Sequence, residues 1–253
     1  MKGITFSLLI LFCQPSSSQT CILARVTKNR INVFADSRII TSTYLSASKI
    51  YFRIPETFQK TGGANNIYFA VAGDDIKESY QNALSACNGV GTIIEISESY
   101  KEIETGLLSA LMRIVRIRDE NDFQVTYLNQ VCAEAIFFGF ENDTAKIVRV
   151  TFTVLNDIRQ IYYNGTFFFA PFVSCNIQDY YITKGKISKI IPIGHIEGIK
   201  DSVEIESIWT KDPLKTGERL LRRQIDSTPE IVGLPIHVVE LRRNKKMKEW
   251  DIN

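Results

Sequence analysis

The order of its predicted elements is the feature that most constrains the fold of this chain. Strand patterns come first, followed by two consecutive helices, more strands, a third helix and a closing strand. The first strands are predicted at 22–27, 31–35, 49–54 and 67–72, and the two helices at 74–87 and 97–118. The next strands are predicted at 133–140, 146–154, 165–169 and 187–193, the third helix at 212–226 and the closing strand at 235–241. Hairpins and paired helices, without alternating βαβ units, predict an α+β fold in which helices cover two stacked sheets.

Composition supports a single globular domain. The chain has 253 residues, of which 45% are hydrophobic and 23% are charged, so it can bury a substantial core. The 30 Lys and Arg residues nearly balance the 28 Asp and Glu residues, and this balance predicts no nucleic-acid partner. A basic cluster at 242–248 is predicted to be a solvated turn or tail, and residues 244–253 are assigned to a basic C-terminal tail.

Residues 1–19 have the pattern of a secretory signal peptide. Lys2 supplies the positive charge, residues 4–13 form a short apolar core, and residues 15–18 form the small-residue region before a cleavage site. The apolar run is too short to span a bilayer comfortably. We therefore expect an exported protein, secreted or periplasmic, with no membrane association once the signal is removed.

The cysteines that remain after removal of the signal do not have the spacing of a metal site. They are Cys21, Cys87, Cys132 and Cys175. The sequence contains no CxxC pair, and its two histidines, His195 and His237, are far apart. We expect neither a metal nor an organic cofactor. An oxidising compartment would allow one disulfide, and the sequence leaves its partners open.

The junction between the signal and the mature chain determines the predicted chemistry. Cleavage after Gln19 would leave Thr20 with a hydroxyl nucleophile and a free α-amine, which can act as its own general base. Cleavage one bond later would expose Cys21, whose thiol is intrinsically the better nucleophile. Ser16 and Ser18 instead fit a cut before Gln19. The sequence therefore leaves three mature N-termini open.

Several short motifs resemble those of one family. Residues 20–24, with the Asp-Ser-Arg motif at 36–38, resemble the opening of proteasome β-type subunits and their bacterial relatives, which are N-terminal-nucleophile hydrolases. Residues 48–50 resemble the segment that carries the family's lysine, and residues 70–74 resemble its glycine turn before the first long helix. Weaker likenesses lie at 135–140 and 232–239. The chain looks like a divergent, exported, bacterial-type member.

This resemblance implies a four-layer αββα sandwich and a threonine-type peptidase or amidohydrolase. Thr20 Oγ would be the nucleophile, Lys49 a cation that favours the neutral α-amine, and Asp36 the partner that holds Lys49. The Gly73 amide would stabilise the oxyanion, and Arg38 would brace the site. The resemblance also implies a peptide or small amide substrate and a homo-oligomeric ring.

The predicted domain spans 20–243, and two of its motifs depart from the family. The family's Ser-Gly-Ser corresponds to 193–198, and its Asp-x-x-Ser-Gly corresponds to 229–233, where Glu230 stands near the carboxylate position and Gly233 alone matches. Two alternatives to a threonine hydrolase therefore stay open. One is a catalytically inactive assembly or binding protein with this fold, and the other is an acylase that depends on Cys21.

Overall fold

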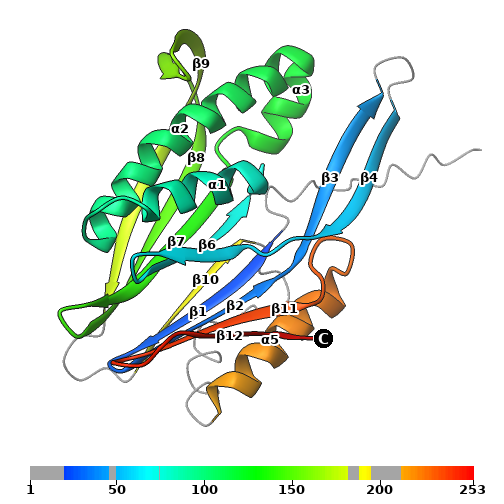
Figure 1. Cartoon of the computed structure of the whole chain (residues 1–253). Helices are drawn as coiled ribbons and strands as arrows, with labels where there is room; N and C mark the ends of the chain where they lie inside the picture. Colours follow the sequence, from blue (N-terminus) through cyan, green and yellow to red (C-terminus); the bar gives the residue numbers. More distant parts are fainter. Residues whose placement is uncertain (1–19, 46–49, 74, 182–187, 195–211) are drawn as a thin grey trace, which may run out of the picture.

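The computed structural model describes residues 20–45, 50–73, 75–181, 188–194 and 212–253. Two five-stranded antiparallel sheets pack face to face, and a separate two-stranded hairpin extends beyond them (Figure 1). Helices pack against the outer face of each sheet. The predicted α+β class is confirmed.

The first sheet combines strands from both ends of the described chain. Its order is β10-β1-β2-β11-β12, with every neighbouring pair antiparallel. The strands are β1 (Cys21–Thr27), β2 (Arg30–Asp36), β10 (Ser188–Gly194), β11 (Ile236–Arg242) and β12 (Lys248–Ile252). A two-residue turn joins β1 to β2, so the start of β1 lies beside the end of β2.

The second sheet has the order β5-β6-β7-β8-β9 and is also antiparallel. Its strands are β5 (Thr61–Ala64), β6 (Ile67–Gly73), β7 (Val131–Glu141), β8 (Thr144–Tyr163) and β9 (Thr166–Tyr181). The last two are longer than the predicted strands at 146–154 and 165–169, because their pairing continues past an irregularity between Val154 and Ile158. The separate hairpin pairs β3 (Arg38–Leu45) with β4 (Ile50–Thr57).

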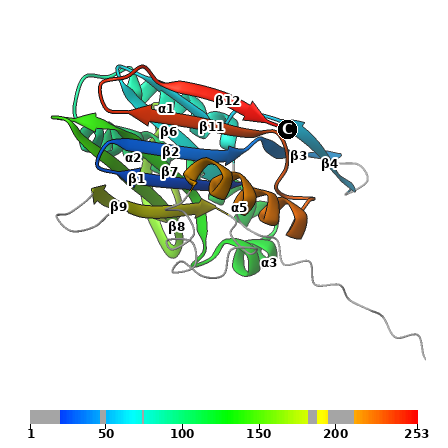
Figure 2. The ribbon, with the colours of Figure 1, turned by 90° about the horizontal axis from the view of Figure 1, so that it is seen from below.

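The helices cover opposite sides of the molecule. The helices α1 (Ile76–Cys87) and α2 (Ile93–Arg118) pack against the second sheet, and a short helix α3 (Glu120–Asp122) and a π-helical turn η1 (Phe123–Tyr127) follow them. The helix α5 (Pro213–Ser227) packs across β1 and β2 of the first sheet, where it lies in the foreground of Figure 2.

Sequence signals at the helix starts explain where these helices begin. Thr92 and Glu95 form a capping box that starts α2 four residues before the predicted position. Asp212 caps α5, and Pro213 occupies its first turn, where the missing N–H costs nothing. Gly217 allows α5 to approach the sheet closely, because a Cβ atom there would lie 2.4 Å from the ring of Phe34.

Alternation along β1 divides the core into layers. Ile22 and Ala24 face the second sheet, in a cluster to which both sheets contribute. Cys21 and Leu23 face α5 on the opposite side. A third cluster joins α1 and α2 to the outer face of the second sheet around Phe69. The central strands are therefore buried on both faces, which explains their nearly continuous apolar sequences.

The C-terminal residues correct one prediction. The expected basic tail over 244–253 is wrong, since Lys248–Ile252 form β12 and pair with β11. Trp250 and Ile252 pack against the α5 cluster, while Glu249 and Asp251 point to the other side. The lysines before this strand obscured an alternating pattern that is typical of a half-buried strand.

The predicted signal peptide falls on residues 1–19 and lies outside the described residues. Among the helices of the described ranges, none is long and apolar enough to cross a membrane.

Candidate active site

Segments from both sheets meet at one end of the molecule. On the first sheet, the start of β1 lies beside the end of β2, because Ile22 pairs with Ala35. The start of β11 joins them, since Ile236 pairs with Asp36. On the second sheet, the residue before β5 is Lys60, whose backbone carbonyl accepts a hydrogen bond from Val71 of β6 at 3.0 Å. The side chain of Lys60 connects the two sheets at this end.

Asp36 and Lys60 form an ion pair between the sheets. Lys60 Nζ lies 2.9 Å from Asp36 Oδ1 and 3.0 Å from Oδ2, and neither side chain has exposed surface. Lys60 Nζ also donates to the carbonyl of Arg38. Backbone amides of Cys21, Arg38 and Gly233 donate to the same carboxylate at 2.8, 3.1 and 3.3 Å. These donors satisfy the carboxylate, as a stable buried ion pair requires.

Burial acts against the charge of both partners. It lowers the pKa of Lys60 and raises the pKa of Asp36, while the attraction between the two side chains opposes each shift. The pair lies in a region from which solvent is excluded, where a charge acts on its neighbours more strongly than it does in water. A group beside this pair would therefore have its own protonation altered.

The predicted lysine, Lys49, is not among the described residues, and a different lysine lies beside Asp36. Lys49 belongs to residues 46–49, which lie outside the described part of the chain. The lysine that bonds to Asp36 is Lys60, 24 positions after it. The prediction missed β3, although its sequence is rich in β-branched residues. Recognition of the strand at 38–45 would have directed attention to Lys60, the next lysine in the sequence after Lys49.

Thr20 and Cys21 have opposite environments. Thr20 precedes β1 and is fully buried, and alternation puts its side chain on the side of Ile22, which faces the second sheet. The Cys21 thiol faces the other way, into the cluster under α5. Burial, followed by the charge of Asp36, raises the pKa of this thiol. Lys60 opposes this shift but does not outweigh it. The thiol is therefore held protonated in an apolar cluster, which argues against Cys21 as a nucleophile.

Gly73 ends β6 at the same edge of the molecule. Contacts through β10 and β7 connect Gly73 to the start of β1. Gly194 of β10 pairs with Cys21, and the amide of Gly194 donates to Glu134 of β7 at 2.7 Å. Glu134 in turn pairs with Ala72, the residue before Gly73. Gly73 has a φ of 127°, and a Cβ atom there would lie 2.5 Å from the backbone of the neighbouring strand. Both the conformation and the close approach require glycine.

Ser37 and Arg38 contact the loop before β11. The Arg38 guanidinium donates to the carbonyl of Pro229. The amide of Ser37 donates to the carbonyl of Gly233 at 3.2 Å, and a Cβ at Gly233 would lie 2.5 Å from Arg38 Nε. The supporting role of Arg38 in catalysis stays a prediction. Glu230, by contrast, is exposed to solvent.

The cysteines and acidic residues form no metal site within the described residues. The four cysteines there, Cys21, Cys87, Cys132 and Cys175, are free thiols. His195 and the rest of the predicted departure at 195–198 lie outside the described ranges.

Comparisons with known proteins identify distant structural likenesses. No protein-family model and no curated protein matches the sequence. Among solved structures, Anbu from Hyphomicrobium sp. strain MC1 is 14% identical, with 92% of this chain and 87% of that chain covered and a TM-score of 0.48. Anbu from Yersinia bercovieri, described as an ancestral beta-subunit, is 15% identical, with 92% and 86% covered and a TM-score of 0.48.

A third similar structure is Thiobacillus denitrificans BPH in complex with epoxomicin. It is 10% identical, with 89% of this chain and all of that chain covered, and its TM-score is 0.43. At these values the likenesses establish neither family membership nor an activity for this chain.

Proposed function

We propose that this chain is an exported N-terminal-nucleophile hydrolase of the four-layer αββα, proteasome-like type, which cleaves a peptide or small amide through an acyl-enzyme on Thr20. The observation that carries the proposal is the buried Asp36–Lys60 pair at the start of β1. Asp36 accepts from the amide of Cys21, so the peptide bond that links Thr20 to Cys21 is part of the same hydrogen-bonded group.

The position of the ion pair supports a catalytic role over a purely structural one. A buried ion pair stabilises a fold weakly, because desolvation offsets most of the attraction, and apolar side chains would serve as well. Asp36 bonds to the amide of Cys21, so the pair lies close to the position at which the α-amine of Thr20 would form. Strongly shifted groups beside a nucleophile are typical of active sites.

The proposed reaction uses two functions of one residue. The α-amine of mature Thr20 takes the hydroxyl proton as Oγ attacks the amide carbon, and it then protonates the leaving nitrogen as the C–N bond breaks. The ammonium of Lys60 favours the neutral amine, since two neighbouring cations repel each other. The amide of Gly73 would stabilise the oxyanion. Water then attacks the ester, and the acid product leaves with Thr20 restored.

Cleavage after Gln19 is a condition of this mechanism. Thr20 has no exposed surface in the chain that still carries residues 1–19, and an α-amine exists only after that bond is broken. Export followed by trimming would provide the mature enzyme. Because the trimming would follow export, the enzyme would become active only outside the cytoplasm.

One observation favours a second candidate function. Glu230 is exposed, so the carboxylate of the family's Asp-x-x-Ser-Gly motif has no replacement at that position. A catalytically inactive assembly or binding protein that retains the fold would tolerate this loss. No comparable observation favours the Cys21 acylase.

Covalent labelling tests the proposed function. The protein is expressed with residues 1–19, and intact mass with N-terminal analysis shows whether the exported form starts at Thr20. A peptide epoxyketone, which reacts with a hydroxyl and an adjacent amine, should label this form. We expect Thr20→Ala to abolish the label and Thr20→Ser and Cys21→Ala to retain it.

Other outcomes would decide between the candidates. A persistent Gln19 start, or a mature Thr20 start without any label, would reject the threonine mechanism and favour the binding protein. Loss of the label in Cys21→Ala alone would implicate the thiol. Circular dichroism of each variant separates loss of reactivity from loss of the fold.

We also propose that the mature protein forms a homo-oligomeric ring through the β8–β9 hairpin. Tyr162, Phe167 and Phe169 expose 60%, 65% and 67% of their surface there, and exposed apolar groups of this kind often mark interfaces. Light scattering on the exported protein measures the assembly, and a monomer at all concentrations would contradict it.

A further inference from the structure

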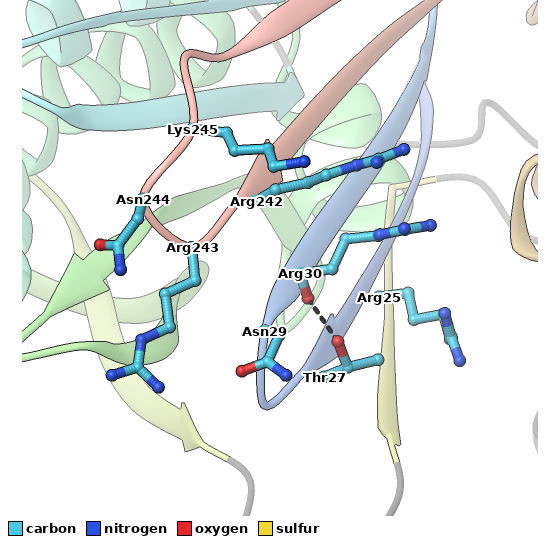
Figure 3. A pocket seen from close by; sticks show the side chains of 8 residues that line it. All are labelled: Arg25, Thr27, Asn29, Arg30, Arg242, Arg243, Asn244 and Lys245. Carbon is cyan, nitrogen blue, oxygen red and sulfur yellow. Dashed lines mark hydrogen bonds between the residues drawn. The ribbon is translucent and has the colours of Figure 1, made fainter.

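A basic depression lies at the end of the first sheet opposite the candidate active site. Its volume is about 720 Å³, and Figure 3 shows the side chains that line it. They come from the β1–β2 hairpin and the turn after β11, and are Arg25, Thr27, Asn29, Arg30, Arg242, Arg243, Asn244 and Lys245. We call this depression the basic basin.

Strand alternation explains why the cations gather here. Cys21 and Leu23 of β1 face α5, so Arg25 lies on the same face of the sheet, further along the strand. Arg30 of β2 and Arg242 of β11 are register partners and share that face. This part of the face lies beyond the cluster under α5, and it carries charges in place of apolar side chains.

Arg25 is the unusual member of the basin. Its surface is only 6% exposed, and its Nε atom is buried without a hydrogen-bond partner. Among the described residues its side chain forms no hydrogen bond or ion pair. Burial, followed by repulsion from Arg30, lowers the pKa of its guanidinium. A buried cation without a partner raises the free energy of the folded chain. A bound anion would lower that free energy again.

The charges of the basin do not balance. Glu240 pairs with Arg30 at 3.5 Å and with Arg242 at 2.6 Å. Asp143 pairs with Arg243 at 2.8 Å. Among the described residues, five lining cations therefore face two carboxylates, which leaves an excess of three positive charges.

We propose that the basic basin binds a soluble anion that carries two or more linked phosphate groups. A guanidinium presents paired N–H donors whose geometry matches phosphate oxygens, and Arg25 has these donors available at the inner wall of the basin. A ligand of about three negative charges would neutralise the excess. The eight lining residues include no aromatic ring, so recognition rests on the phosphates rather than on a stacked base.

The inference is independent of the proposed hydrolase. The basin lies at the Thr27–Arg30 end of the β1–β2 hairpin, whereas Asp36 and Cys21 lie at its other end. A protein that lacks all hydrolytic activity could still bind the anion. Failure of one proposal therefore leaves the other intact.

Titration calorimetry at constant ionic strength tests the site. Inorganic pyrophosphate is titrated into the wild-type chain, and inorganic phosphate serves as the weaker, singly phosphorylated comparison. We expect pyrophosphate to bind with a Kd below about 1 mM and Arg25→Gln to weaken it by about tenfold or more. Lys101→Gln, in which the substituted lysine lies on α2, is the matched control that removes one charge elsewhere and should bind normally.

A second variant keeps the test valid if Arg25→Gln fails to fold. Arg243 is partly exposed at the rim, so Arg243→Gln should fold and should also weaken binding. Absence of pyrophosphate binding by wild type would overturn the proposal. An affinity equal to that of wild type in both Arg25→Gln and Arg243→Gln would also overturn it. Binding to phosphatidylserine vesicles without binding to pyrophosphate would also overturn it and would indicate a membrane surface instead.

Discussion

Lys60 and Arg25 are two buried cations at opposite ends of the first sheet, and their surroundings differ. Lys60 contacts the carboxylate of Asp36, which three backbone amides also bind. Arg25 is nearly as buried but has no counter-charge among the described residues and lies near Arg30. The charge of Lys60 is neutralised inside the protein, whereas the charge of Arg25 would be neutralised by the bound anion that we propose.

A buried charge has different consequences when it is paired and when it is not. A satisfied ion pair keeps its geometry and can act on a neighbouring group, as proposed for Lys60 and the Thr20 amine. An unsatisfied charge raises the free energy of the folded chain and lowers it again when a ligand binds. Removal of the two cations should therefore change stability in opposite directions.

The largest expected effect is the loss of Lys60. Lys60→Met leaves the Asp36 carboxylate buried without its cation, so we expect the free energy of unfolding to fall by about 3–5 kcal/mol. Urea unfolding followed by circular dichroism measures this change. Equal stability of Lys60→Met and wild type would show that the pair does not hold the sheets together. The proposed difference between Lys60 and Arg25 would then be rejected.

A buried acid on the helical side provides an intermediate case. Glu104 of α2 accepts hydrogen bonds from Ser79 and Asn82 of α1, and no cation in the described part of the chain pairs with it. Burial raises its pKa from 4.5 to about 7, the two hydrogen bonds lower it, and the charges of Asp75 and Glu78 raise it. Like Arg25, Glu104 has no counter-charge among the described residues. Unlike Arg25, it can become neutral by binding a proton.

The sign of the pH dependence follows from this shift. Between pH 4.5 and about 7 the folded chain holds a proton at Glu104 that the unfolded chain has lost, so stability is full below pH 4.5 and falls as the pH rises through about 7. The two pKa values correspond to about 3 kcal/mol. Glu104→Gln should remove this part of the pH dependence, as measured by urea unfolding from pH 4 to about pH 8. An unchanged profile would show that Glu104 does not titrate in this window.

The smallest expected effect has the opposite sign to the first. Arg25→Met removes a desolvated charge and leaves an apolar stem, so we expect the anion-free protein to gain about 1 kcal/mol of stability. Thermal unfolding without phosphate and with pyrophosphate checks this prediction, and the variant should lose the stabilisation by pyrophosphate. Lys101→Gln breaks an exposed pair with Glu98 and should change stability by less than about 0.5 kcal/mol. Destabilisation of Arg25→Met would show that its cation is satisfied in the folded chain.

The sequence predicted most strands and helices, because local periodicity is a direct signal of burial. The strands at 22–27 and 31–35 appear as β1 and β2 within one residue at each end, and the third helix appears as α5. β12 was missed because lysines before it resembled a tail, and β3 because its polar threonines and serine interrupted the apolar pattern. Of the predicted site residues, Asp36, Gly73 and the start of β1 lie at one edge, whereas Lys49 lies outside the described residues and Lys60 contacts Asp36.

Local sequence patterns suffice to specify the types of element and the spacing of Thr20 and Asp36 along the chain. Strand alternation also specifies that the side chains of Thr20 and Cys21 point to opposite sides of the sheet. Only the tertiary structure shows which lysine contacts Asp36, and that Arg25 contacts no carboxylate of the described residues. Both facts depend on pairing between distant segments, since Lys60 precedes a strand of the second sheet and Arg242 belongs to β11. Local patterns specify the face on which a charge lies, whereas strand pairing determines which other charges share that face.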